Sequence, residues 1–178
     1  MDEEDGMLEP ATVARLAAVR LLSVDVDGVL TDGGVYVHDD GSQTRRFNVK
    51  DGMGLQLVEQ GGIAVAIVTA ATISAVRHRM QGLGIRHLRM GVEDKLAALD
   101  GLRAELGLEW PAVAHIGDDV NDLPVLRRVG CPLSVADAVA AARAAAIHVS
   151  RRRGGDGAVR EICDLLLRLR LRQPPGGS

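Results

Sequence analysis

Short apolar runs alternate with amphipathic stretches along most of this chain. The apolar runs are nearly continuous, which is typical of strands that are buried on both faces of a parallel sheet. The expected strands are 21–26, 63–69, 85–90, 113–119, 131–135 and 147–150. The expected helices are 54–62, 72–84, 94–108, 121–130, 136–146 and 156–172. This alternation predicts an α/β fold, in which a Rossmann-like parallel sheet carries helices on both faces.

One insertion follows the first strand. Residues 35–47 contain two extended pieces around Asp40-Gly41, and an Asp-Gly pair in that setting is a hairpin signal. We expect a β-hairpin that exposes Tyr36 and Phe47. A lone hairpin is only marginally stable in water, so it would gain stability by pairing with the same hairpin of other copies. The expected assembly is a homotetramer with a shared barrel of hairpins, in which a neighbour lines each active-site crevice.

Polar side chains stand where three of the expected strands end. Asp25 and Asp27 close the first strand, Thr69 closes the second, and Asp118 and Asp119 close a third. In open parallel sheets ligands bind outside the carboxyl ends of the strands. We therefore expect these five residues to face one crevice, although they are far apart in the sequence.

Two carboxylates one residue apart repel each other, and a buried unpaired carboxylate costs several kcal/mol. A divalent cation would offset this cost, and carboxylate oxygens are suitable ligands for Mg²⁺. Lys95 opens an expected helix, where the helix dipole does not favour a cation, so a role facing a ligand is indicated. Carboxylates, a hydroxyl and a lysine together suit phosphoryl transfer through an aspartyl-phosphate.

Each of these residues also has a plainer interpretation. Asp25 and Asp27 alone could form a solvated strand end, Thr69 a strand cap and Lys95 a solvated helix start, while Asp122 could support its own helix. The five histidines, His38, His78, His87, His115 and His148, are interpreted as surface or satisfied core residues. The run Arg151–Arg153, taken alone, is interpreted as a solvated charge run.

The order of the motifs makes the chain resemble a known family. DVDGVLTDG (25–33), Thr69, Lys95 and GDDVND (117–122) resemble the four motifs of haloacid-dehalogenase-type phosphatases. Within that superfamily the chain resembles the capless 3-deoxy-octulosonate 8-phosphate phosphatases and their sialic-acid-type relatives. The matching segments are DVDGVLTDGGVY (25–36), RFNVKDGMG (46–54), GVEDKL (91–96), IGDDVNDLPVL (116–126) and RRGGDGAVREICDLLL (152–167).

The resemblance implies a role for each motif residue. Asp25 would be the nucleophile and Asp27 the general acid and base, with Thr69 and Lys95 as further catalytic residues. Mg²⁺ would be held by Asp25, the backbone carbonyl of Asp27, and Asp118. The residues expected to bind substrate or phosphate are Thr69, Ala70, Lys95, Gly28, Asp51 and Arg153. Asp119 and Asp122 resemble additional carboxylates of the site, in or just behind it.

One position departs from the family pattern. The family usually reads Thr-Gly-Arg or Thr-Gly-Glu after the second strand, whereas this chain reads Thr69-Ala70-Ala71. Phosphoryl chemistry does not need the missing side chain, whereas recognition of the substrate is the role that its loss affects. The expected activity is hydrolysis of a sugar acid phosphate, such as 3-deoxy-octulosonate 8-phosphate in lipopolysaccharide biosynthesis. The alternatives are a phosphatase retuned to another sugar or nucleoside phosphate and a catalytically idle scaffold domain.

Composition narrows the classes of partner. The net charge of −3 does not suit a nucleic-acid binder. Cys131 and Cys163 form neither a metal-like pair nor a disulfide framework, which fits a reducing compartment. The acidic start MDEEDG is the reverse of a signal peptide, and no apolar run approaches the ~20 residues of a membrane span. We expect a cytoplasmic protein with no membrane partner and one domain at 9–172, flanked by disordered tails at 1–8 and 173–178.

Overall fold

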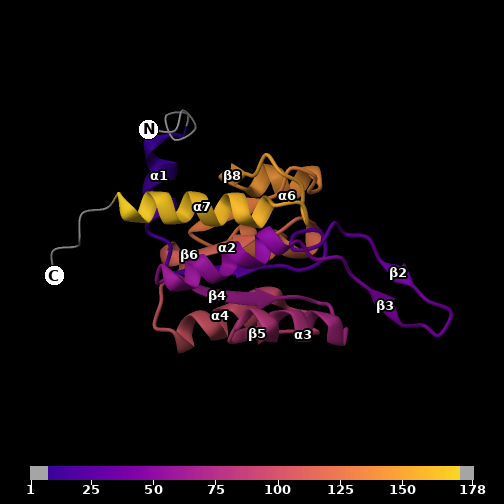
Figure 1. Ribbon diagram of the computed structural model, residues 1–178. Coiled ribbons are helices and arrows are strands. Elements are labelled where there is room, and N and C mark those ends of the chain that lie inside the picture. The colour runs from indigo at the N-terminus through magenta and orange to yellow at the C-terminus, as the bar shows by residue number, and fades with distance from the viewer. Residues whose placement is uncertain (1–7, 173–178) are drawn as a thin grey trace.

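The computed structural model describes residues 8–172, which fold around a six-stranded parallel sheet (Figure 1). The strand order is β5-β4-β1-β6-β7-β8. The strands are β1 (Leu21–Val24), β4 (Ala64–Val68), β5 (His87–Arg89), β6 (Val113–Ile116), β7 (Cys131–Ser134) and β8 (His148–Val149). The helices are α1 (Pro10–Ala17), α2 (Val49–Gln60), α3 (Ser74–Leu83), α4 (Lys95–Glu105), α5 (Leu123–Leu126), α6 (Ala140–Ala145) and α7 (Ala158–Leu171). Short 3₁₀ turns cover Trp110–Ala112 and Val120–Asp122.

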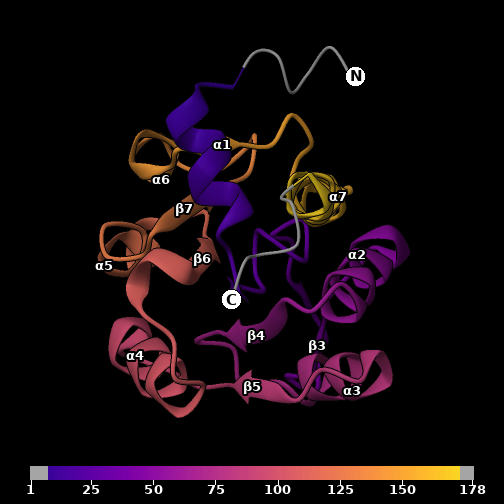
Figure 2. The same cartoon turned by 90° about the vertical axis from the view of Figure 1, so that its left-hand side faces the viewer.

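The predicted α/β architecture is confirmed. Helices α2, α3 and α7 lie on one side of the sheet and α4, α5 and α6 on the other (Figure 2). The tails expected at 1–8 and 173–178 lie outside the described residues except for Leu8, which is partly buried against the core. No helix among residues 8–172 is long and apolar enough to cross a membrane.

The central strands are buried on both faces, which explains their unbroken apolar sequence. Leu22 and Val24 pack in the larger apolar cluster with residues of α2 and α7, whereas Leu21 packs in the smaller cluster with residues of α4. Successive side chains of a strand point to opposite faces, so β1 supplies both layers of the core. Truncating a buried leucine such as Leu22 to alanine would cost about 2–5 kcal/mol.

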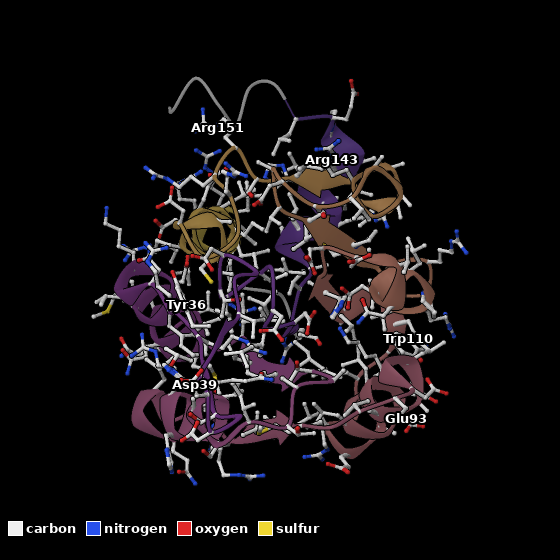
Figure 3. The ribbon with its side chains drawn as sticks, turned by 90° about the vertical axis from the view of Figure 1, so that its right-hand side faces the viewer. Tyr36, Asp39, Glu93, Trp110, Arg143 and Arg151 are labelled. Carbon is white, nitrogen blue, oxygen red and sulfur yellow. The ribbon has the colours of Figure 1, made fainter. Side chains whose placement is uncertain are left out.

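The predicted hairpin is present and projects from the body of the domain (Figure 1). It consists of β2 (Tyr36–Val37) and β3 (Gln43–Thr44), which pair antiparallel. Tyr36 belongs to β2 and is 60% exposed (Figure 3). The prediction that Phe47 is exposed is wrong, because Phe47 forms a bridge with Thr31 and packs against the core.

Helix boundaries differ most from the prediction around α2. This helix begins at Val49, five residues before the expected start at 54, and includes Gly52 and Gly54. A Cβ on Gly54 would lie 3.0 Å from the Arg160 Cα, so glycine allows α2 to pack closely on α7. The helix expected at 121–130 is shorter, because only α5 follows the 3₁₀ turn as α-helix. Helix α1 was not predicted.

Candidate active site

A cavity of about 350 Å³ opens at the carboxyl ends of β1, β4 and β6. The side chains of Asp25, Asp27, Thr69, Asp118 and Asp119 all line it. These residues come from three strand ends that are adjacent in the sheet, because β4 and β6 both pair with β1. The structure thus brings together the five residues that the sequence placed at one edge of the sheet.

A tight turn carries the two aspartates that follow β1. Gly28 adopts a positive φ of 82°, a conformation that residues with a side chain rarely adopt. The Thr31 hydroxyl accepts hydrogen bonds from the backbone N–H of Gly28 and Gly33, both at 3.2 Å. A Cβ on Gly28 would also collide with the Asp118 carboxylate. Gly28 therefore allows the two acidic strand ends to approach each other.

Two glycines after β8 support this turn from behind. The Gly155 N–H donates to the Val29 carbonyl at 2.9 Å. A Cβ on Gly154 would overlap the Gly28 carbonyl oxygen, and one on Gly155 would crowd the backbone of Thr31. The segment at 154–155 is therefore in close backbone contact with the loop that carries the aspartates.

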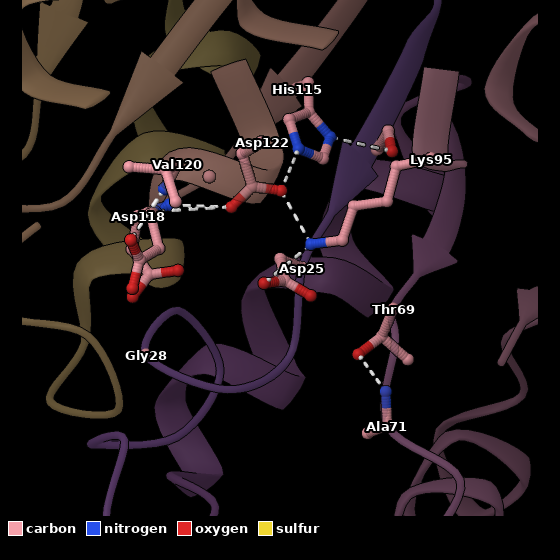
Figure 4. A network of polar contacts seen from close by, with 12 residues as sticks. Asp25, Gly28, Thr69, Ala71, Lys95, His115, Asp118, Val120 and Asp122 are labelled. Carbon is pink, nitrogen blue, oxygen red and sulfur yellow. Dashed lines mark hydrogen bonds and ion pairs between the residues drawn. The ribbon is translucent and has the colours of Figure 1, made fainter. Parts of the chain in front are cut away.

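Lys95 reaches the site from the first turn of α4. The Asp94 carboxylate caps this helix by accepting from the Ala97 N–H at 2.9 Å, which fixes where the helix begins. Lys95 Nζ lies 3.0 Å from Asp25 Oδ2 and 2.7 Å from Asp122 Oδ1 (Figure 4). Burial disfavours the charge of Lys95, but the two carboxylates outweigh burial and raise its pKa. Burial, together with the charge of Asp122, raises the pKa of Asp25 against the opposing effect of Lys95.

Asp122 is the centre of a buried polar network (Figure 4). Its Oδ1 accepts from Lys95 Nζ and lies 3.1 Å from His115 Nε2. Its Oδ2 accepts from the backbone N–H of Asp118 at 3.1 Å and of Asp119 at 3.4 Å. Burial raises the pKa of Asp122, but His115 and Lys95 outweigh burial and lower it, so this carboxylate is ionised. Asp122 therefore both supports its own helical turn and orients Lys95.

Sequence reasoning missed part of this network. His115 is a satisfied core histidine, with Nδ1 3.0 Å from the Ser23 hydroxyl oxygen. Ser23 and His115 are register partners on β1 and β6, so they lie side by side. Because an ionised carboxylate can only accept, Asp122 requires the hydrogen of His115 to be on Nε2. Two polar residues inside otherwise apolar strands were the signal that could have revealed this pair.

The acidic cluster fits a divalent cation. Oxygens of Asp25, Asp118 and Asp122 lie within 4.8 Å of one another. Both oxygens of Asp122 already accept hydrogen bonds, so Asp25 and Asp118 are the pair available to a metal ion. Burial, with the charges of Asp25, Asp122 and Asp119, raises the pKa of Asp118 to about 7. A hard cation with carboxylate ligands would offset this concentration of negative charge.

Thr69 follows β4 directly, on the side of the cavity opposite Asp118. Its hydroxyl accepts from the Ala71 N–H at 3.1 Å, which shapes the turn that Ala70 also belongs to (Figure 4). Ala70 and Ala71 both line the cavity, where the family pattern has a glycine and a longer polar residue. The wall that these two alanines form is therefore small and uncharged.

Asp27 has a partner that the sequence did not suggest. Arg45, just beyond β3, donates from Nε to Asp27 Oδ1 at 2.8 Å. This contact links the hairpin to the cavity. No sequence motif predicts the contact between Arg45 and Asp27, because the two residues are eighteen positions apart on opposite sides of the hairpin.

Two of the expected ligand-binding residues lie away from the cavity. Asp51 is buried in α2, and its carboxylate accepts from the backbone N–H of Gly157 at 3.2 Å and of Arg160 at 2.9 Å. It caps the start of α7, which joins the two helices. Arg153 is 74% exposed and pairs with Asp137 at 3.3 Å. Among the described residues, neither of these two lines the cavity, and Lys95 does not line it either, because its side chain is 3% exposed and meets Asp25 instead.

Residues 90–162 match the family model described as haloacid dehalogenase-like hydrolase. The 3-deoxy-D-manno-octulosonate 8-phosphate phosphatase of Yersinia pestis is 43% identical over 162 residues, which is 91% of this chain and 87% of that protein.

Solved structures resemble the whole fold. The crystal structure of 3-deoxy-D-manno-octulosonate 8-phosphate phosphatase from Moraxella catarrhalis, in complex with magnesium, phosphate and KDO, has a TM-score of 0.87 and 39% identity. The match covers 90% of this chain and 92% of that one. A cobalt-bound phosphatase from Haemophilus influenzae has a TM-score of 0.85 and 34% identity, and the match covers 89% and 92% of the two chains. The likeness therefore extends over nearly the whole chain.

Proposed function

Because the chain belongs to the 3-deoxy-D-manno-octulosonate 8-phosphate phosphatase family of haloacid dehalogenase-like hydrolases, we propose that it hydrolyses the phosphate ester of a sugar acid with Mg²⁺ as cofactor. The family makes the chain a phosphoric monoester hydrolase. The observation that supports the proposal best is the convergence of Asp25, Asp27 and Asp118 on one cavity, with Lys95 bonded to Asp25.

The proposed reaction has two steps. In the first, an Asp25 carboxylate oxygen attacks phosphorus, the bond from phosphorus to the sugar oxygen breaks, and the proton of the Asp27 carboxyl passes to that oxygen. In the second, Asp27 takes a proton from water as the water oxygen attacks phosphorus, and the bond between phosphorus and Asp25 breaks. The products are the free sugar acid and inorganic phosphate, and both aspartates return to their starting states.

The remaining residues supply charge and orientation. Asp25 and Asp118, with the backbone carbonyl of Asp27, would hold Mg²⁺, which supplies charge neutralisation between the phosphate and the attacking carboxylate. Thr69 and Lys95 would stabilise the oxygens of the phosphoryl group. Asp122 keeps Lys95 beside Asp25, as its 2.7 Å contact indicates.

The proposed substrate is 3-deoxy-octulosonate 8-phosphate, the compound named in the relatives, which would place the reaction in lipopolysaccharide biosynthesis. One observation favours a second candidate, a phosphatase retuned to another sugar or nucleoside phosphate. Among the described residues that line the cavity there is no lysine or arginine, and Ala70 and Ala71 form part of its wall. A sugar carboxylate would therefore find no cationic partner on that wall within one subunit.

A substrate panel separates these candidates. Phosphate release would be measured with Mg²⁺ on 3-deoxy-octulosonate 8-phosphate, a sialic-acid-type 9-phosphate, neutral sugar phosphates and nucleoside monophosphates. The proposal predicts the highest kcat/KM on an acidic sugar phosphate. A preference for neutral sugars or nucleotides would favour the retuned enzyme, and no release from any compound would favour an idle scaffold.

Assembly and location are also proposals. We expect a homotetramer joined through the hairpins, because Tyr36 and Val37 are large and exposed on β2, one on each face of the hairpin. A cytoplasmic location is in keeping with two free cysteines, Cys131 and Cys163, which are both buried. We expect neither a nucleic acid nor a membrane as partner.

A further inference from the structure

Arg45 has an unusual setting for a residue at the base of a projecting hairpin. Its side chain is only 7% exposed, whereas the Asp27 side chain that it contacts is 40% exposed. The 2.8 Å bond joins a guanidinium to a carboxylate, and such charge-assisted bonds are among the stronger hydrogen bonds in proteins. A buried arginine thus holds the carboxylate that faces the cavity.

The hairpin in turn holds the arginine. Arg45 donates from a terminal nitrogen to the Gln43 side-chain oxygen at 3.1 Å, and Gln43 belongs to β3. Two residues beyond Arg45, Phe47 bridges to Thr31 at the end of the loop that carries Asp27. Gln43 therefore holds Arg45 to the hairpin, and the Phe47 bridge holds the end of the hairpin segment to the loop of the same subunit.

The contact leaves half of the Asp27 carboxylate available. Arg45 bonds to Oδ1, and among residues 8–172 no hydrogen bond to Oδ2 is made. A group that exchanges protons with a substrate must lie within hydrogen-bond reach, about 2.6–3.2 Å, of the reacting oxygen. One fixed oxygen restricts the rotation of the carboxylate, so the other is presented in a limited range of orientations.

We propose that Arg45 is a positioning residue for proton transfer, through which the hairpin orients Asp27 within its own subunit. This inference rests on the proposed role of Asp27 as general acid. Arg45 does not exchange the proton; it fixes Oδ1, so that the Oδ2 hydroxyl donates to the oxygen that leaves phosphorus.

The test compares two leaving groups. A sugar alkoxide needs a proton as it leaves, whereas a nitrophenolate leaves readily without one. For both esters kcat/KM reports only the steps up to the first irreversible bond cleavage, so later hydrolysis of the aspartyl-phosphate does not enter. A defect in acid catalysis therefore lowers kcat/KM selectively for the sugar phosphate.

The variants are Arg45→Gln and Arg45→Lys, with Arg46→Gln as matched control. Arg46 is the adjacent arginine, is exposed, and contacts Asp32 rather than Asp27. We expect Arg45→Gln to lose at least ~10-fold in kcat/KM on the sugar phosphate, part of the ~10²–10⁴ that a positioned acid supplies, and much less on nitrophenyl phosphate. Arg45→Lys should recover part of the loss, and Arg46→Gln should behave as wild type on both esters.

Equal losses on both esters in Arg45→Gln and Arg45→Lys would overturn the proposal, as would no loss on either. If Arg45→Gln does not fold, the ratio of the two esters in Arg45→Lys decides between selective and uniform loss. Asp27→Asn tests the assumption that Asp27 is the general acid. If Asp27→Asn itself shows no selectivity between the esters, the role of Asp27 fails independently of Arg45.

Discussion

The Lys95 ammonium lies 2.7 Å from the Asp122 carboxylate, and both side chains are almost completely buried. Asp122 is itself held by the backbone of the loop after β6 and by His115 on β6. Lys95 is consequently fixed from behind, with Asp25 in front of it at 3.0 Å. The position of the positive charge in the site therefore depends on a carboxylate that does not line the cavity.

Replacing Asp122 tests this dependence. Asp122→Ala leaves the buried Lys95 with Asp25 alone and removes the acceptor for two backbone N–H groups, so we expect a loss of about 3–5 kcal/mol in the free energy of unfolding. Activity should fall as well, because Lys95 is no longer fixed. Asp122→Asn keeps an acceptor and should lose less stability. Denaturant unfolding measures both variants, and equal stability of wild type and Asp122→Ala would contradict the network.

Asp25→Asn should abolish turnover, because an amide is a poor nucleophile toward phosphorus. The fold should survive, since burial raises the pKa of Asp25 and the neutral amide removes the cost of a buried charge. Phosphate release gives the activity, and circular dichroism with thermal melting serves as the folding control. Release at a rate near that of the wild type would remove Asp25 from the role of nucleophile.

Asp27→Asn should slow turnover of a sugar phosphate by at least ~10²-fold, the usual lower value for a positioned acid or base. Both steps should be affected, because one carboxyl group gives the proton and then takes one from water. Steady-state kinetics on an ester with a poor leaving group measures the loss. An unchanged rate on that ester would exclude Asp27 as the proton donor.

We expect metal binding and the stability of the fold to depend on pH through the same carboxyl group, that of Asp118. EDTA should silence the enzyme and Mg²⁺ should restore it. In the metal-free protein the pKa of Asp118 is raised from 3.8 to about 7, so between these values the folded state binds more protons than the unfolded chain. The contribution of Asp118 to stability is therefore present at low pH and is lost as pH rises through this window.

Mg²⁺ competes with the proton on Asp118, whose ionisation Asp25, Asp119 and Asp122 oppose and Lys95 favours. The rise in melting temperature on adding Mg²⁺ should therefore be larger at about pH 8 than at about pH 6. Asp118→Asn provides the control and should lose most of this difference. An equal rise at both values of pH in the wild type would speak against Asp118 as a ligand.

We expect the oligomeric state to depend on the exposed residues of the hairpin. Replacing Tyr36 and Val37 together with serine should shift a tetramer toward smaller species, because both side chains are exposed on β2 and apolar. Asp39→Ser, a change in the turn between β2 and β3 (Figure 3), is the matched control and should leave the assembly unchanged. Sedimentation velocity measures the species. A wild-type protein that is monomeric and fully active would reject the shared barrel.

Much of the sheet could be predicted from sequence, because strands buried on both faces are continuous apolar runs. The strand ends were equally predictable: Asp25, Thr69 and Asp118 meet because parallel strands end at the same edge. The start of α2 could not be predicted from sequence, because Gly52 and Gly54 lower the helix propensity of its first turns. Glycine is needed at position 54 for tertiary packing, because it leaves room for the backbone of α7.

Long-range side-chain partners were the hardest part of the site to predict. Asp51 belongs to a segment that resembles the family, yet its carboxylate caps α7, more than a hundred residues away. The contact of Arg45 with Asp27 and that of His115 with Asp122 depend on how loops and strands are juxtaposed. The spacing of residues in the sequence does not predict such contacts, so they become visible only in the folded chain.

The glycines at 154 and 155 have a consequence for how the enzyme is made. They press against the turn that follows Asp25, and Asp51 ties the start of α7 to α2. A nascent chain still held by the ribosome can therefore contain Asp25, Lys95 and Asp118 and yet lack the segment on which their loop rests. We expect such a chain to hydrolyse no phosphate ester, so that activity begins only when synthesis of the domain is complete.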